Sequence, residues 1–391
     1  MQNPIIIIGS SIAGITAAEA AHRQDPAADI LVLSQDRFPP YYRLRVCEVL
    51  DNPAIVDQLA LHPPQWYADR QIRLELDTRV AAIYPAERQV GLADGRRLTY
   101  RSLVIASGSQ SFIPPVTGIR RPGVHAIWTL QDALDTASDL TKATRAVVIG
   151  GGLLGLEAAW HARRRGLPTT VIEKAPRLLV NQLDEGGSAI LTQRVRQQQV
   201  EVVTGADVTA VTGSTGEPDS PAAGVRLADG RFFPADLVLV SIGVRANINF
   251  LEGSGIAVQR RICADERMQT SQPDIYAAGD AAELDGYWFG LWSVSRAQGQ
   301  VAGLNAAGGN ARFDKAIPPY LINTMDTRVA VQGDKGIADQ PEYELDVLMD
   351  PDSGNYRKLV YRDGIFSGFM LVGGNFDFNQ LQKKIGQPGP V

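Results

Sequence analysis

Two glycine-rich turns in this chain have residue types and spacings that suit phosphate binding. In the more regular one, Gly150, Gly152 and Gly155 form a G-x-G-x-x-G pattern between an apolar β-branched segment and an alanine-rich segment. The first glycine permits a tight turn, the second lets the backbone approach a pyrophosphate, and the third lets a helix pack closely on a strand. The N–H groups at the helix start then face the phosphates. This turn predicts a dinucleotide site.

An acid stands where such a site needs one. Glu173 ends the next predicted strand, 23 residues after Gly150 (173 − 150). A carboxylate there accepts hydrogen bonds from a free ribose 2′-hydroxyl and repels a 2′-phosphate, so it favours NADH over NADPH. Lys174 and Arg177 follow closely and would weaken this preference. A turn that serves packing alone is the competing interpretation, but it does not explain the acid.

The turn near the N-terminus is less regular. Gly9 and Gly14 keep the outer glycines, whereas Ser11 replaces the middle one. The added hydroxyl can still donate to a phosphate oxygen. Ser34, followed by Gln35, stands where a ribose-binding acid is expected. Taken alone, this turn fits a second dinucleotide site and a purely structural loop equally well.

A third stretch favours the second dinucleotide. Asp280 follows Gly279 after a short predicted strand, at the expected start of a helix. A buried carboxylate is costly without polar partners, and the ribityl chain of a flavin offers hydroxyl groups. The alternative is a helix-capping aspartate. Capping would explain Asp280 alone, but not its occurrence together with two glycine turns.

The composition is that of a globular protein with more than one domain. The chain has 391 residues, of which 45% are hydrophobic and 21% charged, as in ordinary globular proteins. Its net charge of −5 argues against a nucleic-acid-binding protein. No apolar run reaches the roughly 18 residues of a membrane span, and the apolar N-terminal run lacks the basic start of a signal peptide.

The cysteines and histidines indicate neither a disulfide framework nor a metal site. Cys47 and Cys263 lie far apart and outside any C-x-x-C pair. This usage favours a reduced, cytoplasmic setting. The four histidines form no ligand-spaced cluster with each other or with cysteine, so we expect no bound metal; they are His22, His62, His125 and His161.

The pattern of elements predicts an α/β fold with two Rossmann-like dinucleotide-binding domains, for FAD and NADH, and a small C-terminal α+β domain. Short apolar runs predict buried parallel strands at 5–8, 30–33, 146–149 and 169–172, with helices over 15–22 and 156–165. The expected domains are 1–115 with 246–312 for FAD, 116–245 for NADH, and 313–391 at the C-terminus. In the last domain, Asp363-Gly364 predicts a tight hairpin turn.

Together these motifs resemble FAD-dependent pyridine nucleotide oxidoreductases, most of all NADH:rubredoxin reductases, followed by the FAD-binding part of nitrite reductase large subunits. The resemblance covers roughly residues 1–310. It implies an enzyme that takes hydride from NADH onto FAD and passes electrons to a small rubredoxin-like protein, as a monomer or homodimer without nucleic-acid or membrane partners. The stretches that carry it include "PPYYRLRVCEVL" (39–50), "LVIASGSQSFIPP" (103–115), "VVIGGGLLGLEAA" (147–159) and "MQTSQPDIYAAGDAAELDG" (268–286).

The resemblance also implies roles for single residues. Glu157 would reach the nicotinamide side of the flavin and is the expected catalytic residue. Asp280 would bind the ribityl chain, Ser34 the adenosine ribose, and Val80 the adenine edge through its backbone. The remaining expected FAD-site residues are Gly9, Ser11, Ile12, Ala13, Gly14, Gln35, Arg43, Ala106, Ser107, Gly108, Gly279 and Ser293, and the NADH site comprises Gly150, Gly152, Leu154, Gly155, Glu173 and Gly243.

Several positions depart from the pattern of the family. Its members usually have an arginine where Gln110 stands, and ferredoxin-reductase relatives tend to have a lysine where Glu48 stands. The redox-active cysteine pair of the disulfide reductases is missing. Cys47 is then either a lone redox cysteine, as in some NADH oxidases and peroxidases, or a packed thiol.

Three other functions stay open at this stage. They are an NADH oxidase or peroxidase, a redox-sensing FAD-bound interaction protein, and a subunit that needs a metal-bearing partner. For an acidic electron acceptor we expect a locally basic docking face. The candidate charges are Arg43 and Arg45, Arg120 and Arg121, Arg163 to Arg165, and Lys383 and Lys384.

Overall fold

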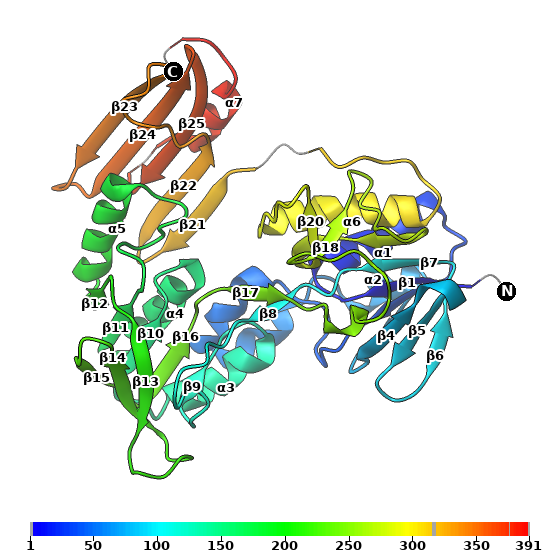
Figure 1. Cartoon of the computed structure of the whole chain (residues 1–391), viewed down its shortest axis with the longest axis horizontal. Helices are drawn as coiled ribbons and strands as arrows, with labels where there is room; N and C mark the ends of the chain where they lie inside the picture. The colour runs from blue at the N-terminus through cyan, green and yellow to red at the C-terminus, as the bar shows by residue number, and fades with distance from the viewer. Residues whose placement is uncertain (1–2, 315–317, 375, 390–391) are drawn as a thin grey trace. The chain divides into compact units, whose positions relative to one another are not determined.

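The computed structural model describes residues 3–314, 318–374 and 376–389. The chain forms two compact units, each built from separate stretches of sequence (Figure 1). The first consists of Met1–Val46, Ala54–Gln110 and Val244–Ala316, and the second of Cys47–Pro53, Ser111–Gly243 and Ile317–Val391. The domain boundaries expected from the sequence stay a prediction.

A parallel five-stranded sheet forms the centre of the first unit, in the order β19-β7-β1-β2-β3. All residues of β1, β2 and β7 are buried, which explains why these strands are apolar throughout rather than alternating. The strands predicted at 5–8 and 30–33 are confirmed residue for residue. The bounds are β1 (Ile5–Ile8), β2 (Ile30–Leu33), β3 (Ile72–Glu75), β7 (Ser102–Ile105) and β19 (Ile275–Ala277).

Helices α1 (Ile12–Gln24) and α6 (Trp292–Ala306) pack against each other almost backbone to backbone. A Cβ atom on Gly299 would lie 2.2 Å from the carbonyl oxygen of Ala13, and one on Gly303 would lie 2.1 Å from that of Ala17. Only glycine fits at these two positions of α6. The start of α1, which carries the first glycine turn, is thereby fixed against α6.

Smaller elements complete the first unit. An antiparallel sheet comprises β4 (Val80–Tyr84), β5 (Gln89–Leu92) and β6 (Arg97–Thr99), and β18 (Ile262–Ala264) pairs in parallel with β20 (Ala282–Leu284). The expectation that a helix starts at Asp280 is wrong. Gly279–Ala281 forms a short 3-10 turn. The chain then continues as a strand because Ala282–Leu284 pairs with β18. Further elements are α2 (Pro64–Asp69), β17 (Val244–Ala246) and the connecting strand β8 (Ser109–Ser111).

The second unit also contains a parallel five-stranded sheet, in the order β12-β11-β10-β16-β9. The strands predicted at 146–149 and 169–172 are confirmed, and the helix expected over 156–165 runs from Leu153 to Arg164. The bounds are β9 (Val124–His125), α3 (Leu130–Leu140), β10 (Ala146–Ile149), α4 (Leu153–Arg164), β11 (Thr169–Ile172), α5 (Glu185–Gln197), β12 (Val200–Val203), β13 (Val208–Gly213), β14 (Ala222–Leu227), β15 (Phe232–Pro234) and β16 (Leu237–Val240).

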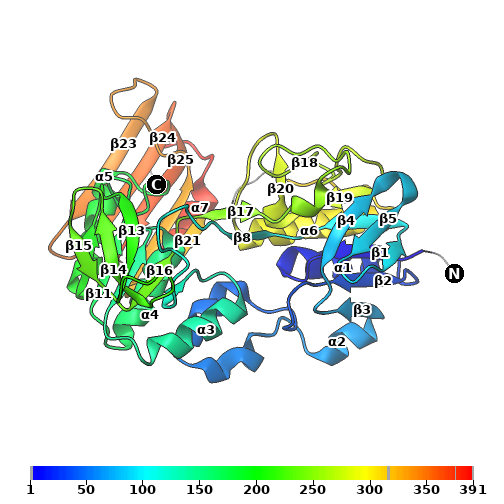
Figure 2. The same ribbon diagram turned by 60° about the horizontal axis from the view of Figure 1, so that its bottom comes forward.

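An antiparallel sheet near the C-terminus follows the order β21-β22-β25-β24-β23 (Figure 1). Figure 2 shows its strands β23, β24 and β25 from a second side. Asp363 and Gly364 have φ values of +52° and +74°, as in the tight hairpin turn that the sequence predicts. Helix α7 packs Phe378 and Leu381 against the apolar side of this sheet. The bounds are β21 (Tyr320–Thr324), β22 (Thr327–Gly333), β23 (Tyr343–Asp350), β24 (Asn355–Arg362), β25 (Ile365–Val372) and α7 (Phe378–Lys384). Among the described residues, no helix combines the length and the apolar character needed to cross a membrane.

Candidate dinucleotide sites

The first glycines of the two turns have the same role. Gly9 has φ +105° and Gly150 has φ +116°, a region that favours glycine. A Cβ atom would lie 2.1 Å from the carbonyl oxygen of Ala106 in the first turn and 2.0 Å from that of Ser241 in the second. Each turn therefore passes directly over the end of a neighbouring strand.

The last glycines match as well. A Cβ atom on Gly14 would lie 1.9 Å from the carbonyl oxygen of Gly9, and one on Gly155 would lie 2.1 Å from that of Gly150. In both turns, the first residues of the helix thus pack against the turn that precedes them. Any larger residue would push α1 or α4 away from its turn.

The middle position explains how the first turn accommodates a serine. Ser11 has φ −79° and ψ −173°, and Gly152 has φ −80° and ψ −179°. Any residue can adopt this extended conformation, and a Cβ atom on Gly152 would meet no atom within 4 Å. Ser11 therefore keeps the geometry of the regular turn. The open space beside Gly152, before the start of α4, suits a pyrophosphate.

Ser34, at the end of β2, is buried and hydrogen bonded. Its hydroxyl oxygen accepts from the Ser10 hydroxyl at 2.7 Å and from the Asp36 N–H at 3.2 Å, so its own proton stays available for a ribose oxygen. Thr78 donates its N–H to the Ser34 carbonyl at 2.7 Å. This contact brings the segment before Val80 to the end of β2, whereas Gln35 is exposed.

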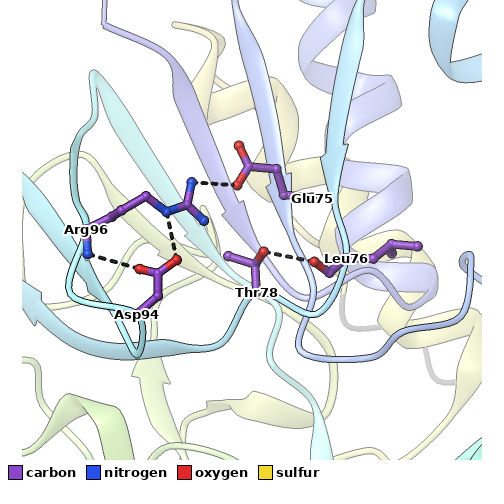
Figure 3. Close-up of polar contacts among 5 residues, drawn as sticks. All are labelled: Glu75, Leu76, Thr78, Asp94 and Arg96. Carbon is purple, nitrogen blue, oxygen red and sulfur yellow. Dashed lines mark hydrogen bonds and ion pairs between the residues drawn. The ribbon is translucent and has the colours of Figure 1, made fainter.

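Polar contacts fix the loop between β3 and β4 (Figure 3). Arg96 bridges Asp94 at 2.7 Å and Glu75 at 3.1 Å, and the Thr78 hydroxyl donates to the Leu76 carbonyl at 2.9 Å. These contacts hold the start of β4, where Val80 is expected to meet the adenine.

The segment after β7 carries an unsatisfied polar atom. The Ser107 hydroxyl is buried and has no hydrogen-bond partner among the described residues. A buried hydroxyl of this kind calls for a polar ligand. Next to it, Gly108 has φ +67° with open space on its Cβ side. Elsewhere in this unit, the Arg43 guanidinium lies 5.3 Å from the ring centre of Tyr41.

Asp280 lies in the first unit with polar partners around it. The Ser109 hydroxyl donates to its Oδ2 at 2.8 Å. The preceding Gly279 has φ +70° and donates its N–H to Oε1 of the buried Gln298 at 2.9 Å. Ser293 is exposed in the first turn of α6. The sequence-based prediction gave no role to Ser109, although it lies in the stretch 103–115 that carries the family resemblance, or to Gln298, which lies outside every quoted motif; the glycines of α6 beside Gln298 were an available signal.

In the second unit, Glu173 is tied to the glycine turn. Its carboxylate accepts from the N–H groups of Gly151 and Ala175, each at 2.6 Å. Lys174 pairs with Asp207 at 3.0 Å, so this cation already has an anionic partner. Gly243 is exposed, with φ +107° and open space on its Cβ side, and Leu154 is half-buried.

Glu157, on α4, is a perturbed carboxyl. Burial and the nearby charge of Glu48 raise its pKa to about 7. Cys47 is fully buried, and burial followed by the charge of Glu157 raises the pKa of its thiol well above the usual value. Both cysteines are free. Cys47 is thus a protonated thiol, which suits a packed residue rather than a redox nucleophile.

The segment Cys47–Pro53 is anchored on α4. Asp51 Oδ2 lies 3.0 Å from Nδ1 of the buried His161 and 3.0 Å from Nη1 of Arg164, and its carbonyl accepts from Arg165 at 3.2 Å. These contacts explain why the segment belongs to the second unit although the residues on both sides of it belong to the first. They also hold Glu48 near Glu157.

Several of the candidate docking charges have structural partners. Arg121 donates to the carbonyls of Glu217 and Pro218 in the β13–β14 loop at 2.8 and 2.6 Å. Arg164 and Arg165 bind Asp51, as described above, whereas Lys383 is exposed. Within the described parts of the chain, no group of three His, Cys, Asp or Glu side chains could hold a metal ion.

The residues present fit the two dinucleotides. Ser11, Ser34, Ser107 and Asp280 lie in the first unit, and the Gly150 turn, Glu157, Glu173 and Gly243 lie in the second. FAD fits the first unit for three reasons. Gly9 and Gly14 leave no room for a side chain in the turn, the buried Ser107 hydroxyl has no partner among the described residues, and the Asp280 carboxylate can accept hydrogen bonds from hydroxyl groups. The glycine turn with its adjacent acid suits NADH.

Comparison with known proteins identifies the family. The model of the pyridine nucleotide-disulphide oxidoreductase family matches residues 3–299. The chain belongs to this family. It is 30% identical over 376 residues to the nitric oxide reductase FlRd-NAD(+) reductase of Vibrio vulnificus, and the aligned region covers 95% of each chain. Its fold is similar to that of putidaredoxin reductase in the covalent complex with putidaredoxin (TM-score 0.89, 26% identity, 100% of this chain and 94% of that chain).

A third relative is named for an activity close to the one expected. The chain is 29% identical over 333 residues to the NADH-rubredoxin oxidoreductase of Clostridium acetobutylicum, covering 84% of this chain and 81% of that protein. With the family match, this makes the chain an FAD-dependent oxidoreductase that uses NADH. Despite the family description, its two cysteines are free.

Proposed function

We propose that this enzyme takes hydride from NADH onto FAD and passes the electrons, one at a time, to a small redox protein such as rubredoxin. The observation that carries the proposal is the pair of glycine turns with matching backbone geometry, one in each compact unit. A chain with two such sites is suited to bring two dinucleotides together for hydride transfer. The relatives named for small-protein acceptors support the choice of acceptor.

The chain's own residues would bind and orient the cofactors. In the second unit, the α4 N-terminus would hold the NADH pyrophosphate and Glu173 the adenosine ribose. In the first, Ser11 and Ser107 would donate to FAD oxygens and Asp280 would accept from ribityl hydroxyls. When bound, FAD supplies the hydride acceptor and releases single electrons. Glu157, with its pKa of about 7, would hold or release a proton beside the nicotinamide.

Preference for NADH is part of this proposal. Glu173 would repel a 2′-phosphate, and Lys174, the nearest candidate cation, is paired with Asp207. The buried, protonated Cys47 argues against the oxidase or peroxidase alternative that depends on a lone redox cysteine. Two free thiols support the cytoplasmic setting that we propose.

Anaerobic titration with NADH, and separately with NADPH, tests the first half of the proposal. Loss of the visible flavin bands at about one equivalent of NADH, with a weaker response to NADPH, is expected. A colourless protein, or a flavin that NADH does not reduce, would contradict it.

Turnover with rubredoxin tests the second half. The rate with rubredoxin should fall as salt is added, because docking of an acidic carrier is electrostatic, whereas the rate with a small neutral dye should stay constant. Rapid consumption of oxygen without transfer to rubredoxin would favour the oxidase instead.

A further inference from the structure

A sharp turn after β20 leads the chain back toward Asp280. Asp285 and Gly286 have φ values of +50° and +77°. Leu284 and Tyr287, on either side, exchange backbone hydrogen bonds at 3.0 and 2.8 Å. This is the geometry of a two-residue hairpin turn. The residue that follows, Trp288, donates its indole N–H to Oδ1 of Asp280 at 3.1 Å.

Arg261 completes a clamp on the same residues. It directly precedes β18, and the parallel pairing of Ile262 with Ala282 brings it to Asp280. Its guanidinium carbon lies 3.8 Å from the ring centre of Trp288, and Nη1 donates to the Asp280 carbonyl. Arg261 is only 5% exposed. Its buried charge has Asp280 and Glu283 as nearby anions.

The hydrogen bonds of Asp280 leave room for a ligand. Trp288 donates to Oδ1 and Ser109 to Oδ2. Each carboxylate oxygen accepts about two hydrogen bonds, so one position on each stays available. With two fixed donors and a clamped backbone, the carboxylate is held in one orientation.

We propose that Trp288 and Arg261 are positioning residues, which hold the Asp280 carboxylate where it accepts hydroxyl groups of FAD. This inference rests on the proposed role of Asp280 in FAD binding. A merely space-filling role does not account for Trp288, because 42% of this side chain is exposed. The loop is also shaped around the indole: Gly290 has φ +62°, and a Cβ atom on it would lie 2.9 Å from the Trp288 ring.

The release of FAD from the holoenzyme, followed by flavin fluorescence after dilution, tests the inference. Trp288→Phe keeps a ring beneath Arg261 but removes the N–H donor to a charged acceptor. We expect FAD to bind roughly tenfold more weakly. Ser109→Ala, which removes the other donor, should act in the same direction. Tyr287→Phe is the matched control, because this neighbouring side chain is 71% exposed, and the variant should bind FAD like the wild type.

A double variant separates positioning from a general loss of structure. If Trp288 acts through the carboxylate, Trp288→Phe should weaken FAD binding when Asp280 is present. The same substitution should have no further effect on FAD binding in a protein that already carries Asp280→Asn. Independent, additive losses in the double variant would overturn the inference, as would wild-type FAD release from Trp288→Phe. If Asp280→Asn itself keeps wild-type FAD binding, the proposed role of Asp280 is wrong and the inference fails with it. Reduction of the flavin by NADH reports separately on the proposed function.

Discussion

The carboxylate of Glu173 closes the second glycine turn: its Oε2 accepts from the Gly151 N–H at 2.6 Å. The same side chain is expected to bind the adenosine ribose of NADH. A carboxylate has enough lone pairs for both tasks. Turn geometry and nucleotide selectivity are therefore coupled through one residue.

This coupling predicts the effect of Glu173→Gln. The amide keeps the size of the side chain but loses one acceptor oxygen and the negative charge. We expect the KM for NADH to rise roughly tenfold or more, and the preference over NADPH to shrink. Steady-state kinetics with both nucleotides and a dye acceptor measure this. The FAD content should stay that of the wild type, since Glu173 lies in the second unit; an unchanged NADH-to-NADPH ratio would contradict the prediction.

The glycine turns predict opposite outcomes for two serine substitutions. Gly152→Ser adds a Cβ atom into open space, so both folding and the KM for NADH should change little, because Ser11 occupies the same backbone position in the first turn. Gly155→Ser places Cβ 2.1 Å from the Gly150 carbonyl oxygen, so it should destabilise the protein by roughly 3 kcal/mol. Thermal unfolding and NADH kinetics of both variants test this. Equal destabilisation by the two would show that the middle position is not free.

Glu157 predicts a pH dependence of stability. Its pKa is about 7 in the folded protein, against 4.5 for an ordinary glutamate. The folded state therefore binds more protons than the unfolded state between these pH values, and stability falls as the pH rises through this window. The loss amounts to roughly 3 kcal/mol above pH ~7. Glu157→Gln should remove this component. Compared with the wild type at the same pH, the variant should therefore do better at pH ~8 than at pH ~5, as judged by the free energy of unfolding in denaturant.

Glu48→Gln is the matched control for Glu157. Because the charge of Glu48 raises the pKa of Glu157, its removal should move the pH dependence to lower pH without abolishing it. The infrared band of a protonated carboxyl offers an independent readout. If that band is the same in the wild type and in Glu157→Gln at neutral pH, then the carboxyl of Glu157 is not the group that holds the proton.

The strands were predictable because burial on both faces leaves a plain signal. Ile5–Ile8 and Ala146–Ile149 are apolar at every position, with a glycine turn directly after each. Ser11 looked like a defect in the sequence, but the backbone at this position is extended and does not need glycine. The sequence could not reveal that conformation.

Contacts distant in sequence were the part that could not be predicted. The helix expected at Asp280 does not form: Asp280 lies in a short 3-10 turn, and the residues after it, Ala282–Leu284, pair with β18. The clamp of Arg261 and Trp288 depends on that pairing. Likewise, the anchoring of Asp51 on α4 joins residues more than 100 positions apart, and no local pattern announces it. These features all depend on tertiary pairing rather than on local propensity.

A cluster of Asp184, Tyr356 and Lys358 at the start of α5 gives the last prediction, and in it Tyr356 and Lys358 are buried. Asp184 caps this helix by accepting from the Gly187 N–H at 3.0 Å, and it also accepts from the Tyr356 hydroxyl at 2.6 Å and from Lys358 at 3.2 Å. Lys358 is only 7% exposed, so Asp184→Asn would leave a buried cation without its anion and cost roughly 3–5 kcal/mol. Lys358→Met removes that cation and keeps the cap, so it should cost less, and Tyr356→Phe should cost roughly 1–2 kcal/mol. Hydrogen exchange of the α5 amides, together with thermal unfolding, ranks the three variants. Equal losses in Asp184→Asn and Lys358→Met would mean that the charge of Lys358 needs no partner there.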